Sequence, residues 1–312
     1  MNIAIFGAGG TGGILAAYLA KAGNDVTLLA RGKHLAAIQA RGITLETPHL
    51  GVLTVPVRAV AAEDYTDTPD ILFICVKYYA LDDAIALVKR IASKDTLVVP
   101  ILNVFGTGEV IQSALDPSGE TLTVLDGCIY VVAHIKEPGV LTQEHKILRV
   151  IYGYRPEQPK RLEEKAKALE AILTQADIRT AYTDDIRAAS LEKFSFVSPM
   201  GAAGLYYGAK AADFQTEGEK RETFKALVAE VQAIGEAMGL TFRHDLVESA
   251  LLLIDKSNPA TITSMQRDVE AGRISEFAGL VTRVCELGKK YGVPTPWYDK
   301  VQERAALLST GR

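Results

Sequence analysis

The sequence predicts an α/β protein in which a doubly wound parallel sheet is followed by an all-helical C-terminal domain. Three observations lead to this prediction. A glycine-rich loop follows the first apolar segment, short β-branched segments alternate with helical patterns over the first half of the chain, and strand patterns cease after Asp184. Strand–helix alternation is typical of a parallel sheet with helices on both faces. We therefore predict two domains, residues 1–183 and residues 184–312.

The elements of the first domain are predicted in strict alternation. Apolar β-branched runs predict strands at 2–7, 25–30, 70–77 and 96–103. Helical periodicity between them predicts helices at 11–22, 33–41, 80–92 and 107–115. Beyond these, the segments 122–135, 136–143 and 145–154 favour antiparallel strands joined by a turn at Pro138-Gly139. A charged helix at 159–175 and a short strand at 178–182 complete the domain.

The second domain shows only helical patterns. Thr216 and Glu219 have the spacing of a capping box, and apolar residues at helical spacing follow until Gly239. Asn258-Pro259 predicts another helix start, because proline is favoured at the first helical position. Residues 276–290 predict a further helix, which Gly292 and Pro294 would stop.

The composition excludes several classes of protein. With a formal net charge of −4 and no block of like charges, the chain lacks the basic surface that nucleic acids and anionic membranes attract. Its five histidines include no pair at metal-ligand spacing, so we predict no metal site. Cys75, Cys128 and Cys285 are each alone in the sequence, which favours reduced thiols. No signal-peptide pattern and no apolar run of the ~18 residues that span a membrane are present, so we expect a cytoplasmic protein.

The glycine-rich loop "IAIFGAGGTGG" predicts a dinucleotide site. Gly7, Gly9 and Gly12 have G-x-G-x-x-G spacing between a strand and a helix, the context of a Rossmann-type domain. Gly7 would allow a tight turn, Gly9 the approach of a phosphate, and Gly12 close packing of helix on strand. The alternative is a purely structural glycine turn.

Arg31 favours NADP(H) over NAD(H). NAD-binding sites usually place a carboxylate at the end of the second strand, but "TLLARGKH" has Arg31 and Lys33 there. A guanidinium would bind the 2′-phosphate of NADP(H) in a bidentate manner. The alternative is an ordinary arginine at the edge of a loop.

Polar residues end two later strands. Lys77 closes "DILFICVK" and Asn103 closes "VVPILN". Because ligands of doubly wound sheets bind beyond the carboxyl ends of the strands, we expect both side chains beside the cofactor, although either could be a plain loop residue.

Lys193 lies in the apolar run "SLEKFSFVSPMGAAG". On a helix it would be in line with Ile186, Ala189, Phe196, Val197 and Met200. A cation on such a stripe must be paired, hydrated or shifted toward neutrality, and burial would favour release of its proton. That behaviour suits a general acid, although a lysine whose stem covers the core and whose amine reaches water is the alternative.

With these residues in view, the sequence resembles the ketopantoate reductases (2-dehydropantoate 2-reductases). The resemblance runs nearly end to end through "GAGGTGG", "LLAR", "CVK", "ILNVFGTGE", "LEKF" and "TSMQRDVEAGRISEFAGLVTRVCELGKKYGVPTP". It implies a Rossmann-type domain joined to a helical domain, and reduction of a small 2-oxo acid by NADPH on the way to pantothenate and coenzyme A.

The resemblance also implies roles for single residues. The predicted cofactor-binding residues are Gly7, Gly9, Gly10, Thr11, Gly12, Arg31, Lys77 and Asn103. The predicted catalytic residues are Lys193 and Glu276, and the predicted substrate-binding residues are Ser264, Asn103 and Lys193. Without the resemblance, Ser264 would be read as a helix-surface serine and Glu276 as a first-turn acid.

Three positions depart from the family pattern. The family usually reads N-G-x-G where this chain has Asn103-Val104-Phe105-Gly106. Where the family usually has asparagines four and eight residues after its catalytic lysine, this chain has Val197 and Gly201. Three hypotheses therefore stay open: reduction of ketopantoate itself, reduction of another, more apolar 2-oxo acid, and a non-catalytic NADP-sensing module. The apolar helical stripes are compatible with a homodimer.

Overall fold

The computed structural model describes residues 1–310 and contains two compact units. The first comprises Met1–Leu102 and Gly106–Ile186, and the second comprises Asn103–Phe105 and the chain from Arg187 onward. The fold class is as predicted, with a parallel sheet and helices in the first unit and helices in the second. The domain limits 1–183 and 184–312 stay a prediction. Residues 311 and 312 of the predicted second domain lie outside the part of the chain that the structure describes.

A six-stranded sheet forms the centre of the first unit, in the order β5-β2-β1-β6-β7-β8. All its neighbouring strands pair in parallel. The strands are β1 (Asn2–Phe6), β2 (Asp25–Ala30), β5 (Arg58–Ala61), β6 (Ile71–Ile74), β7 (Leu97–Pro100) and β8 (Thr123–Val124).

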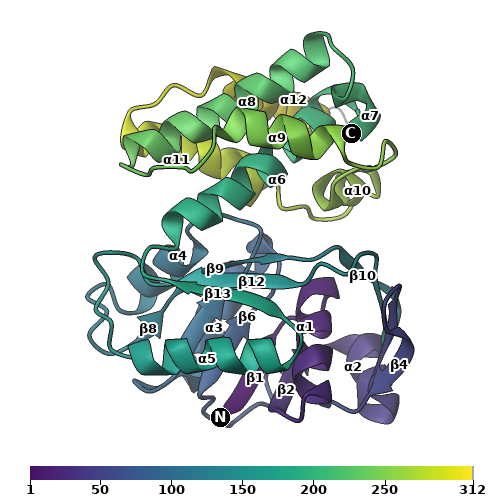
Figure 1. Cartoon of the computed structure of the whole chain (residues 1–312), viewed down its shortest axis with the longest axis vertical. Coiled ribbons are helices and arrows are strands. Elements are labelled where there is room, and N and C mark those ends of the chain that lie inside the picture. The colour runs from purple at the N-terminus through teal and green to yellow at the C-terminus, as the bar shows by residue number, and fades with distance from the viewer. Residues whose placement is uncertain (311–312) are drawn as a thin grey trace. The chain divides into compact units, whose positions relative to one another are not determined.

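Each face of this sheet has its own apolar core. In β1, Ile3 and Ile5 point to one side and Ala4 to the other, because successive side chains of a strand alternate. One core contains residues of α1 (Gly10–Lys21), α2 (Gly32–Arg41) and α5 (Glu163–Gln175). The opposite core contains residues of α3 (Leu81–Ile91) and α4 (Thr107–Leu115). The sheet is therefore covered on both faces (Figure 1).

Two smaller sheets complete the first unit. One has the order β10-β11-β3-β4, from β3 (Ile43–Thr47), β4 (Gly51–Val55), β10 (Ala133–Glu137) and β11 (Val140–Gln143). The other has the order β13-β12-β9, from β9 (Asp126–Tyr130), β12 (Arg149–Gly153) and β13 (Arg179–Thr183).

The prediction for residues 122–154 is partly wrong. The antiparallel hairpin around Pro138-Gly139 is present as β10 and β11, and β9 pairs antiparallel with β12. However, β8 extends the parallel sheet, and β11 pairs in parallel with β3. The strands β3, β4 and β5 were not predicted at all.

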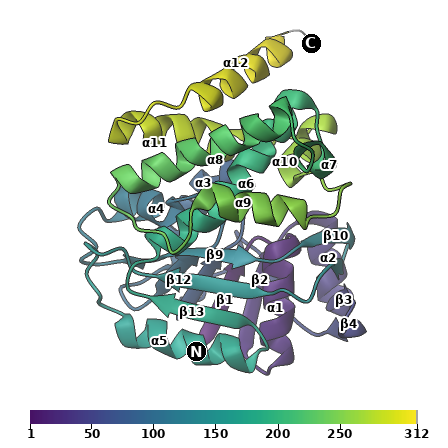
Figure 2. The same cartoon turned by 45° about the horizontal axis from the view of Figure 1, so that its top comes forward.

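The second unit consists of helices. They are α6 (Arg187–Tyr207), α7 (Ala211–Phe214), α8 (Glu219–Ala237), α9 (Leu246–Asp255), α10 (Ser264–Glu270), α11 (Arg283–Tyr291) and α12 (Pro296–Thr310), with a π-helical segment at Ala278–Thr282. Within this unit α8 and α9 run side by side (Figure 1 and Figure 2). The predicted apolar stripe of α8 is its buried face, formed by Phe224, Leu227, Val228, Val231 and Ile234.

Two predicted helix starts in this unit are wrong, and a third helix opens with an unexpected turn type. The capping box at Thr216 and Glu219 is absent, because Gly218 with φ +142° precedes the first residue of α8. Asn258-Pro259 lies in a turn, and the helix that follows begins instead at Ser264, capped by Thr263 and Gln266. The predicted helix 276–290 opens with the π-helical segment rather than an α-helical turn.

Several predicted absences concern the described residues alone. Between residues 1 and 310, no helix is long and apolar enough to cross a membrane. In the same range, no cluster of three or more His, Cys, Asp or Glu side chains is placed to hold a metal ion. Cys75, Cys128 and Cys285 are free thiols.

Candidate active site

The glycine loop leads from β1 into α1 by a path that side chains would block. Gly7 has φ +107°, and a Cβ there would lie 2.9 Å from the backbone of Cys75. A Cβ on Gly12 would lie 2.1 Å from the carbonyl oxygen of Gly7. By contrast, a Cβ on Gly9 would meet nothing within 4 Å. The loop is therefore packed tightly on one side and open at Gly9, the position at which a phosphate would approach.

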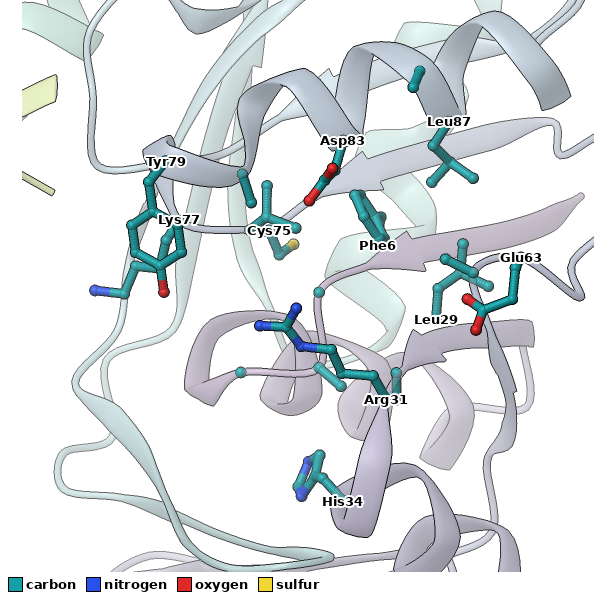
Figure 3. A pocket seen from close by; sticks show the side chains of 18 of the residues that line it. Phe6, Leu29, Arg31, His34, Glu63, Cys75, Lys77, Tyr79, Asp83 and Leu87 are labelled. Atoms are coloured by element: carbon teal, nitrogen blue, oxygen red, sulfur yellow. The ribbon is translucent and has the colours of Figure 1, made fainter. Parts of the chain in front are cut away.

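A cavity of 820 Å³ opens beside this loop, within the first unit. Its walls come from the glycine loop, the end of β2 and the start of α2, the segment after β5, and the end of β6 with α3. Figure 3 shows Arg31 pointing into the cavity from the start of α2, with Asp83 of α3 across from it. The cavity lies beyond the carboxyl ends of parallel strands, where doubly wound sheets bind nucleotides.

Half of the predicted cofactor residues line this cavity. Those that do are Gly7, Gly9, Arg31 and Lys77. Those outside its lining are Gly10, Thr11, Gly12 and Asn103. Gly10 instead packs on β10, because a Cβ there would lie 2.4 Å from the carbonyl oxygen of Ala133. Asn103 belongs to the second unit.

The cavity also contains charged residues that were not predicted. Glu63 and Asp83 bring carboxylates to its wall, and Arg90 brings a guanidinium. Arg90 donates to the backbone carbonyl oxygens of Tyr65, at 2.6 Å, and of Ala62, so its charge is held at the wall. The helical pattern of 80–92 contains Asp83 and Arg90, but nothing local in the sequence shows that they face the end of β2.

This lining fits a dinucleotide. The open face at Gly9 leaves room for phosphates, Arg31 supplies a guanidinium that is exposed at the cavity, and Leu29 and Leu87 supply apolar contacts for a base. Gly7, Gly9, Arg31 and Lys77 are the residues that would hold such a group.

In the second unit, Lys193 contacts Asn103. The Lys193 ammonium donates a hydrogen bond of 2.7 Å to Asn103 Oδ1, although the two residues are 90 positions apart. Lys193 is half-buried on α6, in a helix that presents the buried residues Phe194 and Met200 to the core. The structure thus joins two predicted site residues that the sequence left unconnected.

Aromatic packing holds the Asn103 segment beside α6. Phe105 is 6 % exposed and Phe194 is 2 % exposed, and their ring centroids are 6.3 Å apart. Each residue lies one or two positions from a partner of the Lys193–Asn103 bond. The aromatic contact therefore restricts both partners of that bond.

Glu276 and Ser264 lie at the beginnings of helical segments. Glu276 is 2 % exposed and lies two residues before the π-helical segment. Its backbone carbonyl oxygen accepts a hydrogen bond of 2.9 Å from the Leu280 N–H within that segment. Ser264 is the partly buried first residue of α10. A buried carboxylate is costly unless it is hydrogen-bonded or paired.

Helix α10 packs closely on α6 at two glycines. A Cβ on Gly201 would lie 2.7 Å from Met265 Cε, and one on Gly204 would lie 2.4 Å from the Gln266 side chain. The Met265 thioether thus occupies the space that a side chain at position 201 would need. This contact gives a physical reason for glycine at a position where the family usually has asparagine.

Comparison with known proteins agrees with this geometry. The sequence model described as "Ketopantoate reductase PanE/ApbA" matches residues 3–157, and the model "Ketopantoate reductase PanE/ApbA C terminal" matches residues 185–308. The chain belongs to the ketopantoate reductase family. It is therefore an oxidoreductase, a 2-oxo acid reductase, which confirms the predicted resemblance and the prediction of an enzyme.

Full-length relatives of this ketopantoate reductase family member are known. A 2-dehydropantoate 2-reductase of Mesorhizobium japonicum is 31% identical over 330 residues, which cover 100% of this chain and 99% of the relative. A 2-dehydropantoate 2-reductase of Aquifex aeolicus is 28% identical, over 95% of this chain and 93% of the relative.

Solved structures share the fold. A 2-dehydropantoate 2-reductase of Geobacter metallireducens matches with a TM-score of 0.86 and 25% identity, over 100% of both chains. A ternary structure of D-mandelate dehydrogenase with NADH and anilino(oxo)acetate matches with a TM-score of 0.85 and 21% identity, over 97% of this chain and 96% of that one. The fold is thus found with more than one named activity.

Proposed function

We propose that the protein reduces 2-dehydropantoate (ketopantoate) to pantoate with NADPH, a step of pantothenate and coenzyme A biosynthesis. The observation that carries this proposal is the hydrogen bond of 2.7 Å from the half-buried Lys193 to Asn103, which holds a proton donor in a defined place. The full-length relatives named 2-dehydropantoate 2-reductase support the choice of substrate.

NADP(H) is the proposed cofactor because of Arg31. Its guanidinium enters the 820 Å³ cavity from the end of β2, where it could bind a 2′-phosphate. The fold neighbour D-mandelate dehydrogenase is named with NADH, so the family fold alone does not choose between the two nucleotides. When bound, NADPH supplies the hydride for the carbonyl carbon, and the protein must supply the proton and the orientation.

Lys193 would supply the proton. A ketone that accepts hydride at carbon develops negative charge on oxygen, and an ammonium beside that oxygen stabilises this charge and then donates a proton to it. Asn103 would orient the ammonium, because its side-chain oxygen accepts a hydrogen bond from it.

Glu276 and Ser264 would complete the site. The Glu276 carboxylate would offset the cost of burying the Lys193 charge or accept a bond from a substrate hydroxyl. The Ser264 hydroxyl at the start of α10 would donate to the substrate carboxylate. Both roles come from the resemblance.

A second candidate substrate is a 2-oxo acid with an apolar side chain. Val197 and Gly201 follow Lys193 at intervals of one and two helical turns, and Met265 fills the space beside Gly201. A valine and a thioether make no hydrogen bonds to a substrate hydroxyl. They would instead contact an alkyl or aryl group.

Steady-state oxidation of NADPH with four 2-oxo acids tests both candidates. Ketopantoate, pyruvate, 2-oxoisovalerate and phenylglyoxylate are compared by kcat/KM. The proposal requires ketopantoate to be the best of the four. A preference of tenfold or more for phenylglyoxylate or 2-oxoisovalerate would establish the second candidate, and no oxidation with any of them would contradict both. A cytoplasmic location and a homodimer stay predictions.

A further inference from the structure

His34 lines the cavity, and its ring makes a hydrogen bond to a residue that does not line the cavity. It is on the first turn of α2, and its ring lines the cavity below Arg31 (Figure 3). Its Nδ1 atom accepts a hydrogen bond of 3.0 Å from the backbone N–H of Gly139. Gly139 has φ +85° and forms the turn between β10 and β11. The bond therefore joins the start of α2 to the tip of a hairpin 105 residues later.

This bond defines the protonation of the ring. A neutral imidazole has one acceptor and one donor nitrogen, so a ring that accepts at Nδ1 carries its hydrogen on Nε2. The Nε2 atom is buried and makes no hydrogen bond of full geometry within residues 1–310, although the Ala8 backbone acts on the ring as an acceptor. Burial lowers the pKa of His34, against the smaller opposing effect of this Ala8 contact, and so favours the neutral form that accepts at Nδ1.

The hairpin that His34 contacts also touches the glycine loop. At its tip, a Cβ on Gly139 would lie 3.1 Å from Ala37 Cβ of α2, and the Gly139 carbonyl accepts from Thr44 of β3 at 2.9 Å. At its base, Ala133 lies directly against Gly10. One hairpin is thus in contact with both segments that would bind phosphates, the glycine loop and the start of α2.

A second side-chain bond ties the other half of α2. Arg31 is the N-cap residue of this helix, and its guanidinium is exposed at the cavity. Further along the helix, Gln39 donates to the carbonyl oxygen of Ala59 at 3.0 Å, which ties the C-terminal half of α2 to β5. The His34–Gly139 bond is the corresponding tie of the N-terminal half.

We propose that His34 is a positioning residue for the cofactor: its bond to Gly139 holds the first turn of α2, and with it Arg31, against the β10–β11 hairpin. The proposal rests on the proposed use of NADP(H). Because Arg31 would contact the 2′-phosphate, loss of the bond should weaken NADPH more than NADH.

Two amide variants test whether the role of His34 depends on Nδ1, its accepting nitrogen, or on the rest of the ring. In His34→Asn the side-chain oxygen can occupy the place of Nδ1 and still accept from Gly139, whereas in His34→Gln the polar atoms reach the place of Nε2. We expect His34→Gln to raise the Kd of NADPH by about 3- to 10-fold, the range for one lost hydrogen bond. His34→Asn should stay within about twofold of the wild type, since its bond is kept.

Gln39→Ala is the matched control. It removes the other side-chain tie of α2 without touching the hairpin, so it should leave the Kd of NADPH unchanged. Binding is measured directly by calorimetry with NADPH and with NADH. If Gln39→Ala weakens NADPH as much as His34→Gln does, general loosening of α2 is the cause and the proposal fails.

Two measurements on the cofactor-free protein test the bond itself. The ¹⁵N shifts of the imidazole should report a neutral ring with its hydrogen on Nε2, and exchange of the Gly139 amide hydrogen should be faster in His34→Gln than in His34→Asn. A ring protonated at Nδ1, or equal exchange in both variants, would overturn the proposal. If the wild type binds no nicotinamide nucleotide, the proposed function fails. If it binds NADPH and His34→Gln binds it equally well, only the role of His34 fails.

Discussion

Lys193 and Asn103 illustrate how a single contact gives meaning to residues that are ambiguous in sequence. A lysine on an apolar stripe could extend its amine into water, and an asparagine after a strand could be an ordinary loop residue. The hydrogen bond of 2.7 Å between them shows that the two side chains meet in the folded unit, where each orients the other.

Replacement of Lys193 tests its role as proton donor. We expect Lys193→Ala to lower kcat by at least ~10², the low end for loss of a general acid, and to leave the Kd of NADPH within about twofold. Stopped-flow or steady-state NADPH oxidation measures the first, and calorimetry the second. Lys225→Ala is the control, because Lys225 is a lysine of α8 that pairs with the exposed Glu222. Turnover near that of the wild type in Lys193→Ala would exclude Lys193 as the acid.

Replacement of Arg31 tests the choice of nucleotide. Because a hydrogen bond to a charged group contributes about 1.5–3 kcal/mol, Arg31→Ala should weaken NADPH binding by about 10- to 100-fold. NADH has no 2′-phosphate and should be affected by no more than about threefold. Arg41→Ala, at the other end of the same helix, is the control. Equal losses for both nucleotides would show that Arg31 does not read the 2′-phosphate.

At the scale of elements, buried carboxylates fix where segments begin. Glu230 of α8 is 9 % exposed and accepts from the N–H groups of Trp297, at 2.8 Å, and Tyr298, at 3.2 Å. These are orphan donors of the first turn of α12, which a carboxylate can satisfy. Asp126 has the corresponding place in the first unit, where it accepts from the Gly108 N–H of α4 at 2.6 Å and pairs with buried Arg155.

Glu230 should make stability depend on pH. Burial raises its pKa above the ordinary 4.5, against the opposing effect of the two N–H groups. The folded state then binds a proton more tightly than the unfolded state, so this contribution to stability is full below pH 4.5 and is lost as pH rises through the folded-state pKa. In urea unfolding, the free energy of the wild type relative to Glu230→Gln should therefore fall as the pH rises above 4.5. A difference that stays constant with pH would contradict this prediction.

Asp126 should contribute much more to stability than an exposed acid. Asp126→Asn removes the charge and leaves the guanidinium of Arg155 buried without its partner, which should cost about 3–5 kcal/mol in the free energy of unfolding. Asp67 pairs with Arg58 at 2.8 Å on the surface, and Asp67→Asn should cost no more than about 1 kcal/mol. Comparable losses in the two variants would show that burial of the Asp126 pair is not the cause.

Local sequence predicts elements well where they are self-contained. The strand at 25–30 and the helix at 107–115 have the predicted limits, because hydrophobic period and flanking glycines are local signals. The strands β3, β4 and β5 depend on partners far along the chain, and the parallel pairing of β11 with β3 has no local signal. The helix starts at Glu219 and Ser264 were missed for a related reason, since more than one nearby residue could serve as a cap.

For the molecule as a whole, the candidate site also contains some residues that local sequence predicts and others that depend on distant parts of the chain. Gly7, Gly9, Arg31 and Lys77 could be predicted at one cavity because the carboxyl ends of parallel strands meet at one edge of a sheet. Glu63 could not, because it enters the cavity only through the pairing of β5 with β2, whose last register places Ala30 opposite Ala61. The proximity of Lys193 to Asn103 is likewise a property of the folded second unit and not of either motif.

The short segment Asn103–Phe105 has a consequence for recombination among related enzymes. It belongs to the helical unit although the chain on both sides of it belongs to the sheet unit. A chimera that joins the first 186 residues of one parent to the remainder of another would therefore pair the lysine of one ancestor with the asparagine of the other. Grafting a helical half faithfully requires two inserts, one of them only three residues long.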